Sequence, residues 1–181
     1  MPRLVAVCVV HALRSDSGSV GVTAIDKRPV EGAARVGPLG IRGDVQASRK
    51  HHGGPDKAVY AYAQEDAEHW AAELDRDLPP GWFGENLRVA GIDVNAARIG
   101  EIWRVGDTVE LEVTMPRTPC ATFARWVGGT AGRGWVKRFS DEGRLGAYLR
   151  VRRSGEIRAG DAVEVLSSPA DAPTVLEVYR S

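Results

Sequence analysis

The chain has 181 residues and a formal net charge of zero, and 43% of its residues are hydrophobic. This length fits a single domain, and this hydrophobic content is enough to build a core without a metal or disulfide staple. A protein that grips a nucleic acid backbone usually carries an excess of basic residues, so the balanced charge argues against a nucleic acid partner.

The two cysteines, Cys8 and Cys120, are too few for a disulfide framework and match no spaced zinc motif. The apolar run at residues 4–10 is short and no small-residue cleavage site follows it, so it predicts a first strand rather than a signal peptide. No apolar run reaches the length of a membrane span. We therefore expect a cytoplasmic protein without a membrane partner.

Strands come first along the chain. Apolar runs predict them at residues 4–10, 20–25 and 58–63, and the first of these is rich in β-branched residues. Between the last two, the proline- and glycine-rich residues 28–43 predict only loop and turn. At residues 64–74 the period changes, because Ala67, Trp70 and Leu74 fall on one helical face, and this predicts an amphipathic helix.

A short segment occurs twice. Residues 104–110 read RVGDTVE and residues 158–164 read RAGDAVE, and in both a Gly-Asp pair interrupts the apolar alternation. This pattern predicts a tight turn between two strands. Two hairpins with the same turn sequence explain the repeat more simply than a duplicated fold does. Such hairpins favour an antiparallel, barrel-like architecture.

The remaining elements complete a β-rich α+β fold. Further strands are predicted at residues 87–89, 99–105 and 146–152, and short helices at residues 122–127 and 135–139. The tail ends in residues 175–179, which predict a late strand. We therefore expect a mostly antiparallel, β-barrel-like fold with a few short peripheral helices.

Two glycine-rich motifs are candidates for anion binding. Arg42-Gly-Asp44 and His51-His-Gly-Gly-Pro-Asp-Lys57 suit a loop whose backbone approaches an anion and whose cationic or donor groups point at it. A glycine turn at a strand entrance is the alternative, and it is favoured for Gly-Gly-Pro alone. Neighbouring side chains on an extended chain point to opposite faces, so His51 and His52 are a weak metal pair.

The motif Trp82-Phe-Gly-Glu-Asn-Leu87 contributes two polar candidates. The amide of Asn86 has both a donor and an acceptor, so it could read the edge of a heterocycle, although stabilising a turn is the simpler role. Glu85 is a candidate general acid or base whose partner the sequence does not reveal.

The motif Pro116-Arg-Thr-Pro-Cys120 precedes a predicted short helix. The helix N-terminus and Arg117 both favour the thiolate form of Cys120, and Pro119 restricts the chain, so this thiol is a candidate metal ligand or nucleophile. Most lone cysteines are small buried hydrophobes, so a structural role is an equal alternative for Cys120. For Cys8, inside an apolar strand, the structural interpretation is favoured.

The motifs form an ordered series: Gly40-Ile-Arg-Gly-Asp44, His51-His-Gly-Gly-Pro-Asp-Lys-Ala-Val59, Phe83-Gly-Glu-Asn-Leu87, Pro116-Arg-Thr-Pro-Cys120, Val136-Lys-Arg-Phe139 and Arg158-Ala-Gly-Asp161. This series resembles the MOSC domain family, named for the C-terminal part of molybdenum cofactor sulfurases, and most closely its hydroxylaminopurine-resistance (YiiM-like) branch. The resemblance covers residues 4–166, which would form the MOSC domain, and leaves residues 167–181 as a C-terminal tail.

The resemblance implies a molybdenum-pterin cofactor whose metal is coordinated by Cys120, the expected catalytic residue. The expected cofactor-binding residues are Arg42, Asp44, His52, Gly53, Gly54, Lys57, Asn86, Arg117 and Thr118. The implied activity is the reduction of N-hydroxylated bases or related N-oxygenated small molecules, independently of pyridoxal phosphate. No flavin or haem motif is present, so the electrons would come from a separate reductase.

Members of this branch often continue into a small helical C-terminal extension, which the sequence up to Ser181 does not show, and this leaves the surface for an electron-donating partner open. Two alternative functions stay open as well. In one, Cys120 is a persulfide carrier that delivers sulfur to a metallocofactor. In the other, the chain is a non-catalytic module that binds a cofactor or a partner.

Overall fold

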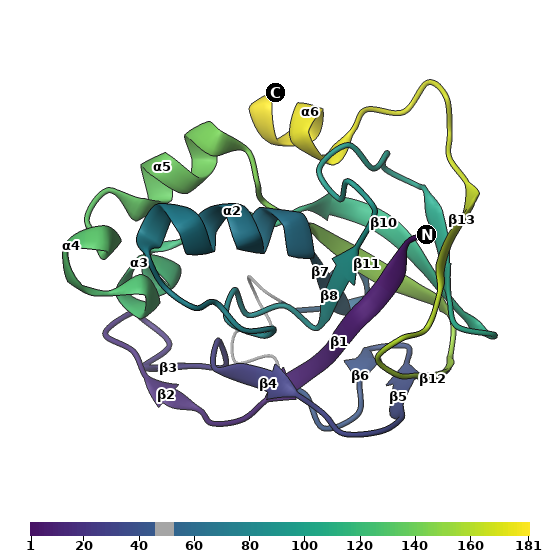
Figure 1. The fold of residues 1–181 in the computed structure, drawn as a ribbon, viewed down its shortest axis with the longest axis horizontal. Helices are drawn as coiled ribbons and strands as arrows, with labels where there is room; N and C mark the ends of the chain where they lie inside the picture. The colour runs from purple at the N-terminus through teal and green to yellow at the C-terminus, as the bar shows by residue number, and fades with distance from the viewer. Residues whose placement is uncertain (46–52) are drawn as a thin grey trace.

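A computed structural model describes residues 1–45 and 53–181, so the predicted roles of His51 and His52 lie outside the described residues. The described residues form an eight-stranded sheet, a three-stranded sheet, a two-stranded hairpin and five short α-helices (Figure 1). The β-rich α+β class expected from the sequence is confirmed.

The large sheet carries most of the fold. Its strands, in spatial order, are β13 (Val163–Ser167), β9 (Ile102–Val105), β10 (Val109–Pro116), β11 (Ala147–Arg153), β7 (Val59–Ala63), β8 (Leu87–Ala90), β1 (Arg3–Val10) and β4 (Lys27–Pro29). All its pairings are antiparallel except that of β7 with β8, which the helix α2 (Gln64–Leu74) connects. Antiparallel strands need only a tight turn, whereas a parallel pair needs a crossover such as this helix.

The start of β1, next to the end strand β4, meets the segment before the other end strand, β13, at one point. Arg3 and Ala162 form an isolated antiparallel bridge, and the Leu4 amide donates to the Asp161 carbonyl oxygen at 2.8 Å. Figure 1 accordingly shows the N-terminus beside β13. The bridge does not extend into a ladder, so the described strands do not close into the expected barrel.

The two smaller sheets contain short strands that the sequence did not predict, apart from β3 (Val22–Thr23), which lies within the strand expected at residues 20–25. β5 (Ala34–Gly37) pairs with β6 (Gly40–Ile41) and with the distant β12 (Gly155–Ile157), and β2 (Arg14–Ser15) pairs with β3. The prediction of loop throughout residues 28–43 is therefore wrong. These strands are too short for a visible period, and β5 depends on a partner far along the chain.

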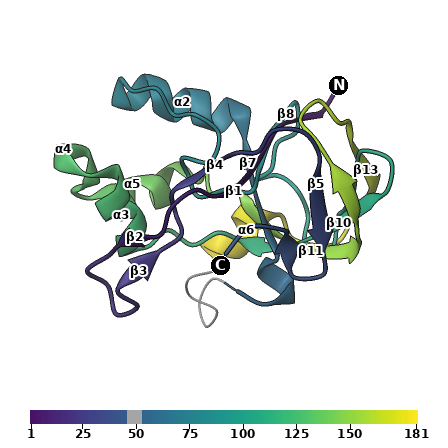
Figure 2. The ribbon, with the colours of Figure 1, turned by 90° about the horizontal axis from the view of Figure 1, so that it is seen from below.

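The helices gather mainly at one end of the molecule (Figures 1 and 2). They are α2, α3 (Ala121–Val127), α4 (Gly129–Gly132), α5 (Trp135–Glu142) and α6 (Val175–Arg180), with a 3-10 turn η1 (Pro55–Lys57) before β7. Among the described residues, no helix has the length and apolar character needed to cross a membrane.

The helix α6 overturns the late strand predicted at residues 175–179. Thr174 accepts a hydrogen bond from the Glu177 amide, and the Glu177 carboxylate accepts one from the Thr174 amide. This reciprocal capping box satisfies two donors at the helix start. β-Branched composition favoured a strand, but the local capping and the burial of Val175 favour the helix.

The repeated Gly-Asp segment has two different structures. The first copy is the predicted turn, since Val105 pairs with Val109 in the β9–β10 hairpin. The second copy lies between β12 and β13, which belong to different sheets. There the Gly160 amide donates to the Leu4 carbonyl oxygen at 2.8 Å, so this copy contacts β1 and the prediction of a second hairpin is wrong.

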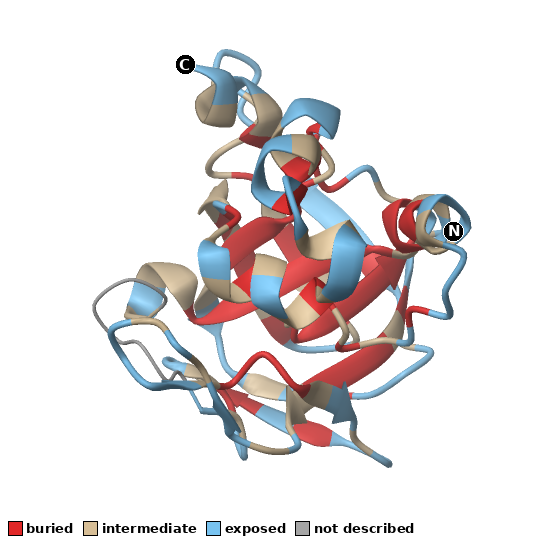
Figure 3. Ribbon diagram, turned by 90° about the vertical axis from the view of Figure 1, so that its left-hand side faces the viewer, coloured by how far each residue is buried: buried red, intermediate tan, exposed pale blue. Residues whose placement is uncertain are grey.

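The large sheet separates two hydrophobic cores, because successive side chains of a strand point to opposite faces. On β7, Val59 and Ala61 enter an aliphatic core, whereas Tyr60 and Tyr62 enter an aromatic one. The aromatic core also contains side chains of α2, α3 and α5, and Figure 3 shows the buried residues concentrated along the strands. Burial of both faces explains why β7 reads as a continuous apolar run.

Candidate functional site

A pocket of about 360 Å³ lies between the ends of several strands, α3 and the β2–β3 hairpin. This volume falls within the range of small-molecule sites. Five of the predicted site residues line the pocket: Asp44, Lys57, Asn86, Arg117 and Cys120. They come from separate segments, and each stands at or near the end of a strand or short helix, where the fold brings these segments together.

Cys120 is the residue directly before α3, and its side chain is partly exposed in the pocket. The helix is fixed by Phe123 and Val127, which are buried in the aromatic core. Cys8 differs, because it is fully buried in β1 and burial raises the pKa of its thiol well above the usual range. The structural interpretation of Cys8 is confirmed, and Cys120 is the accessible thiol of the two.

Arg117 carries a positive charge into the interior. Its side chain lies against the rings of Phe123 and Tyr60, with the guanidinium carbon 4.4 and 5.7 Å from their centroids. The residue is only 6% exposed, and its Nη1 has no hydrogen-bond partner among the described residues. No described carboxylate forms an ion pair with it. A buried cation is costly unless an anion compensates it, so this arrangement suits an anionic ligand.

Two tyrosines form the wall beside Arg117. Tyr60 and Tyr148 are partners across β7 and β11, with ring centroids 5.4 Å apart. Burial raises the pKa of both hydroxyls, and the Arg117 guanidinium acts in the opposite direction on each. Lys57 approaches the same wall, with its Nζ 5.7 Å from the centroid of the Tyr148 ring. Both hydroxyls therefore keep their protons at neutral pH.

The side-chain amide of Asn86 forms hydrogen bonds with other groups of the protein. Its Nδ2 donates to the Cys8 carbonyl oxygen at 3.2 Å and to Asp44 Oδ2 at 2.8 Å, and its Oδ1 accepts from the Tyr60 amide at 3.1 Å. Both amide hydrogens are thus occupied. These contacts favour the structural role for Asn86 over reading a heterocycle, while its contribution to cofactor binding stays a prediction.

Asp44 is also part of this network. Its Oδ2 forms an ion pair with Lys27 Nζ at 2.6 Å, and its Oδ1 accepts from the Val10 amide at 2.9 Å. The carboxylate thereby ties the loop after β6 to β1 and β4. Asp44 and Lys27 neutralise each other inside the pocket, so Asp44 serves first to position the wall.

Glu85 is not suited to the acid–base role suggested by the sequence. The residue is fully buried, with Oε1 accepting from the Gly81 amide and from Arg88 Nε, and Oε2 accepting from the Phe83 amide. The carboxylate fixes the loop before β8. It does not line the pocket.

Other predicted residues lie outside the pocket lining. Arg42 and Thr118 are exposed, and Gly53 and Gly54 are partly exposed before η1. His52 lies in the part of the chain that is not described. Their roles in cofactor binding stay predictions.

Three further pocket residues belong to none of the motifs recognised in the sequence. Asp16, Thr122 and Arg125 line the side opposite the sheet, where the hairpin meets α3. The hydrogen bond from Arg125, assisted by Thr122, lowers the pKa of Asp16 to about 2. The turn-forming segment Asp16-Ser-Gly18 was a local signal for the hairpin, but its partner lies more than a hundred residues away.

The comparisons with known proteins agree with the fold and the motif series. A model of the MOSC domain family matches residues 48–164, which is more than half of the chain. The chain belongs to the MOSC domain family. The resemblance found in the motif series, from the glycine-rich segments to the Cys120 motif, is therefore confirmed at the level of the family.

Three curated relatives of this MOSC protein extend the comparison. YflK of Bacillus subtilis is 37% identical over 80% of this chain and 64% of that protein. YiiM of Escherichia coli is 33% identical over 69% of this chain and 61% of that protein. A protein of Gibberella moniliformis named "Reductase" is 35% identical over 94% of this chain but only 31% of its own length. The chain thus spans less than two thirds of each relative.

Solved structures show the same MOSC fold. YiiM from Geobacillus stearothermophilus superposes with a TM-score of 0.78 at 25% identity, covering 99% of this chain and 83% of that one. YiiM from Escherichia coli superposes with a TM-score of 0.72 at 23% identity, covering 98% and 75%. The large mixed sheet with its short helices is therefore the fold of YiiM.

Proposed function

We propose that the pocket binds a molybdenum-pterin cofactor, with the metal on the thiolate of Cys120, and that the protein reduces N-hydroxylated bases or related compounds. One observation carries the proposal: an accessible thiol lines the same pocket as Arg117, a buried cation that forms no ion pair with a carboxylate of the described residues. The ligand that suits both has a thiophilic metal and an anionic group. MOSC domains are generally associated with this cofactor, and a relative is named a reductase.

The donor set fits a metal that arrives within an organic cofactor. Among the described residues, no three His, Cys, Asp or Glu side chains come together to hold a metal ion. A single thiolate cannot complete a coordination sphere, so the remaining ligands would belong to the cofactor. Four basic and two acidic side chains line the described part of the pocket, which gives the lining a formal charge of plus two for an anionic ligand.

Each residue has a limited task in this proposal. Cys120 would hold the metal, while Arg117 and Lys57 would bind the anionic part of the cofactor. Tyr148 lines the same pocket and keeps its hydroxyl proton, because burial raises the pKa of that hydroxyl. The bound cofactor would supply the two-electron chemistry that removes the hydroxyl oxygen.

The overall reaction requires an electron donor. An N-hydroxyl compound, two electrons and two protons give an amine and water. We propose that a separate electron-donating reductase supplies the electrons.

The test compares the two cysteines in protein made in a host that synthesises the cofactor. Cys120→Ala should lose molybdenum and activity toward N-hydroxylated bases while remaining folded. Cys8→Ala should keep both, with a stability loss of about 1 kcal/mol because a small core group is removed. A Cys120→Ala protein with full activity would refute the proposal.

The same preparations separate the two alternative functions. Cyanide-releasable sulfur on Cys120, without molybdenum, would favour the persulfide carrier. Bound cofactor without turnover of any N-hydroxylated compound would favour the non-catalytic module.

A further inference from the structure

The β2–β3 hairpin forms one wall of the pocket but is not part of either larger sheet. Among the described residues its two strands pair with each other and with no further strand, through Arg14 with Thr23 and Ser15 with Val22. Figure 2 shows both strands beside α3, the helix that begins immediately after Cys120. The position of this wall therefore depends on side-chain contacts rather than on a ladder of backbone hydrogen bonds.

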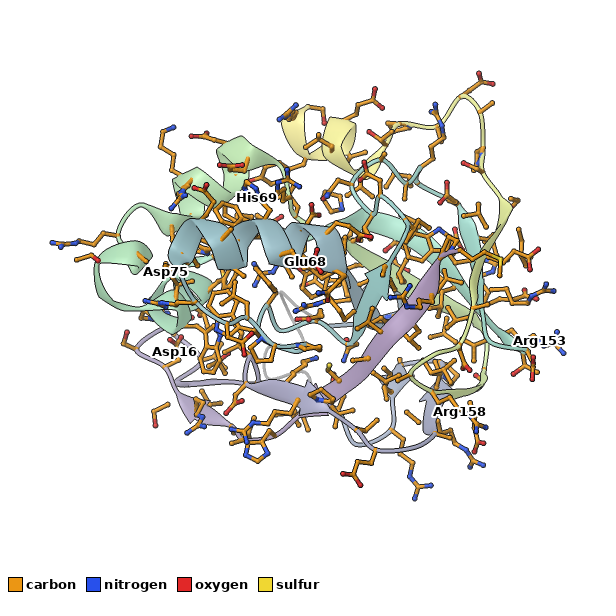
Figure 4. All side chains as sticks on the ribbon, in the orientation of Figure 1. Asp16, Glu68, His69, Asp75, Arg153 and Arg158 are labelled. Atoms are coloured by element: carbon orange, nitrogen blue, oxygen red, sulfur yellow. The ribbon has the colours of Figure 1, made fainter. Side chains whose placement is uncertain are left out.

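Asp16 provides the contact that joins the hairpin to α3. Its Oδ1 accepts from Arg125 Nε at 2.6 Å, and its Oδ2 accepts from Arg125 Nη2 at 2.7 Å and from the Thr122 hydroxyl at 2.9 Å. Oδ2 also accepts from the Gly18 amide at 3.2 Å. The Asp16 side chain, labelled in Figure 4, is only 8% exposed. Such a two-point guanidinium–carboxylate pair fixes both distance and orientation.

A second ion pair holds the base of the hairpin. Arg14 donates through Nε and Nη2 to Asp26 Oδ2, at 2.8 and 2.6 Å. Asp26 is buried and precedes β4, so this contact anchors the hairpin to the large sheet. The Asp16 contact is different because it joins the hairpin to α3, the helix that begins directly after Cys120.

The two sides of the pocket differ in polarity. Arg117 and Lys57 bring positive charge to the sheet side, whereas on the hairpin side Asp16 and Arg125 pair with each other and Val20 and Val22, which are 48% and 42% exposed, provide apolar surface. Cys120 stands in the chain between Arg117 and the α3 residues that bind Asp16. An anionic cofactor group belongs with the cations, so the apolar side suits the neutral ring of a second molecule.

We propose that the β2–β3 hairpin is the wall of the pocket that faces the substrate. Asp16 is the positioning residue that keeps this hairpin beside α3, and therefore close to Cys120. The wall selects flat, neutral heteroaromatic substrates, whose ring faces pack on Val20 and Val22. The substrate part of this inference rests on the proposed function. The positioning part concerns the apo-protein and is testable without any cofactor.

The first experiment measures access to Cys120 in apo-protein. Asp16→Asn should increase the alkylation rate of Cys120 by a polyethylene-glycol maleimide on the order of tenfold, and the rate with iodoacetamide much less. The matched control is Asp141→Asn, which removes the exposed Lys137–Asp141 pair on α5 and should leave both rates unchanged. Equal maleimide rates for wild type and Asp16→Asn would overturn the positioning role.

A charge-swapped variant separates positioning from general loosening. Asp16→Arg combined with Arg125→Asp restores the ion pair with its partners exchanged, so it should return the maleimide rate toward that of wild type. Each single change should leave the wall open. A double variant that is as reactive as the single variants would contradict the proposed contact.

The second experiment uses holoenzyme and two substrates. For Asp16→Asn we expect the KM for an N-hydroxylated purine to rise on the order of tenfold, while kcat, molybdenum content and the KM for a small aliphatic N-hydroxyl compound stay unchanged. An unchanged purine KM would exclude the hairpin as the substrate wall. Loss of molybdenum in this variant would instead assign Asp16 to cofactor binding and would also overturn the inference. If wild type takes up no molybdenum, the proposed function fails, and the maleimide rates still decide the positioning role.

Discussion

Arg117 lies against the rings of Tyr60 and Phe123 and forms a hydrogen bond with the Tyr148 side chain, but no carboxylate of the described residues forms an ion pair with it. Cation–π contacts contribute only about 0.5–2 kcal/mol each, which is small beside the cost of burying a charge. The Arg117 side chain therefore destabilises the ligand-free protein and favours the protein with an anionic ligand bound.

We therefore expect opposite effects of Arg117→Met on stability and on binding. Without ligand, the variant should be as stable as wild type or more stable by about 1–4 kcal/mol, because a buried charge is replaced by an apolar chain. Its cofactor content should fall at the same time. Urea unfolding of apo-protein and molybdenum analysis of holo-protein check the two signs, and a variant that retains full cofactor would contradict the anion-binding role.

Asn86 illustrates the opposite case, a polar residue that serves the fold. Asn86→Ala would leave the Tyr60 amide and the Cys8 carbonyl without their partners and would free one contact of Asp44. Leaving buried polar groups unpaired costs about 1–3 kcal/mol, so the free energy of unfolding should fall by that amount. Chemical denaturation measures it. A change below about 0.5 kcal/mol would mean that the network is not as tightly formed as its distances indicate.

At the scale of elements, the hairpin contact is sensitive to acid. The pKa of Asp16 in the folded protein is about 2, below its usual 3.8, because Arg125 and Thr122 stabilise the carboxylate. Because the pKa is lowered by folding, the charged carboxylate stabilises the folded protein fully at pH values above 3.8. This stabilisation is lost as the pH falls through about 2. The hairpin should thus stay attached at neutral and mildly acidic pH.

This acid sensitivity is measurable through the Gly18 amide, which donates to Asp16. In an NMR titration, its chemical shift should change with a midpoint near pH 2 in wild type. In Arg125→Gln the midpoint should move up toward the usual value of 3.8, since the main stabilising contact is gone. An identical midpoint in both proteins would refute the part assigned to Arg125.

The elements that the sequence predicted correctly are those with a strong local period. The continuous apolar run of β7 and the helical face of α2 are examples. The short strand β5 and the turn at Gly160 could not be predicted in this way, because they form hydrogen bonds with partners distant in sequence. For α6, strand-forming composition outweighed a capping signal that was present at Thr174 and Glu177.

The candidate site shows the same division. The ordered motifs indicated residues such as Lys57, Arg117 and Cys120, and the structure brings these three to one pocket. The motifs did not indicate Asp16 and Arg125. An isolated acidic residue in a turn and a basic residue on a helix are ordinary surface features in a sequence, and only the fold brings these two together.

At the scale of the whole molecule, the aromatic core connects the helices to the pocket. Phe139 on α5 contacts the rings of Trp70, Phe123 and Trp135, and Phe123 is the ring on which Arg117 lies. Helices as short as α3 and α5 are not stable alone, so this packing maintains them.

Phe139→Ala should therefore destabilise the protein by about 3–5 kcal/mol, the usual cost of removing a buried aromatic side chain. We also expect faster hydrogen exchange at the backbone amides of α3. Denaturation and hydrogen exchange measure the two effects. Loss of stability with unchanged exchange in α3 would mean that the helix is held independently of the aromatic core.

The bridge between Arg3 and Ala162 has a consequence for how the chain folds. β1 precedes in sequence every strand it pairs with, and the residues that complete its edge are Asp161 and its neighbours, which come after all the other strands except β13. The backbone groups at this edge of β1, the first strand, therefore stay unpaired until a segment near the end of the chain folds against them. Such non-local closure slows folding, so refolding should take milliseconds to seconds rather than microseconds. Until then β1 is the part of the chain most prone to pair with another molecule.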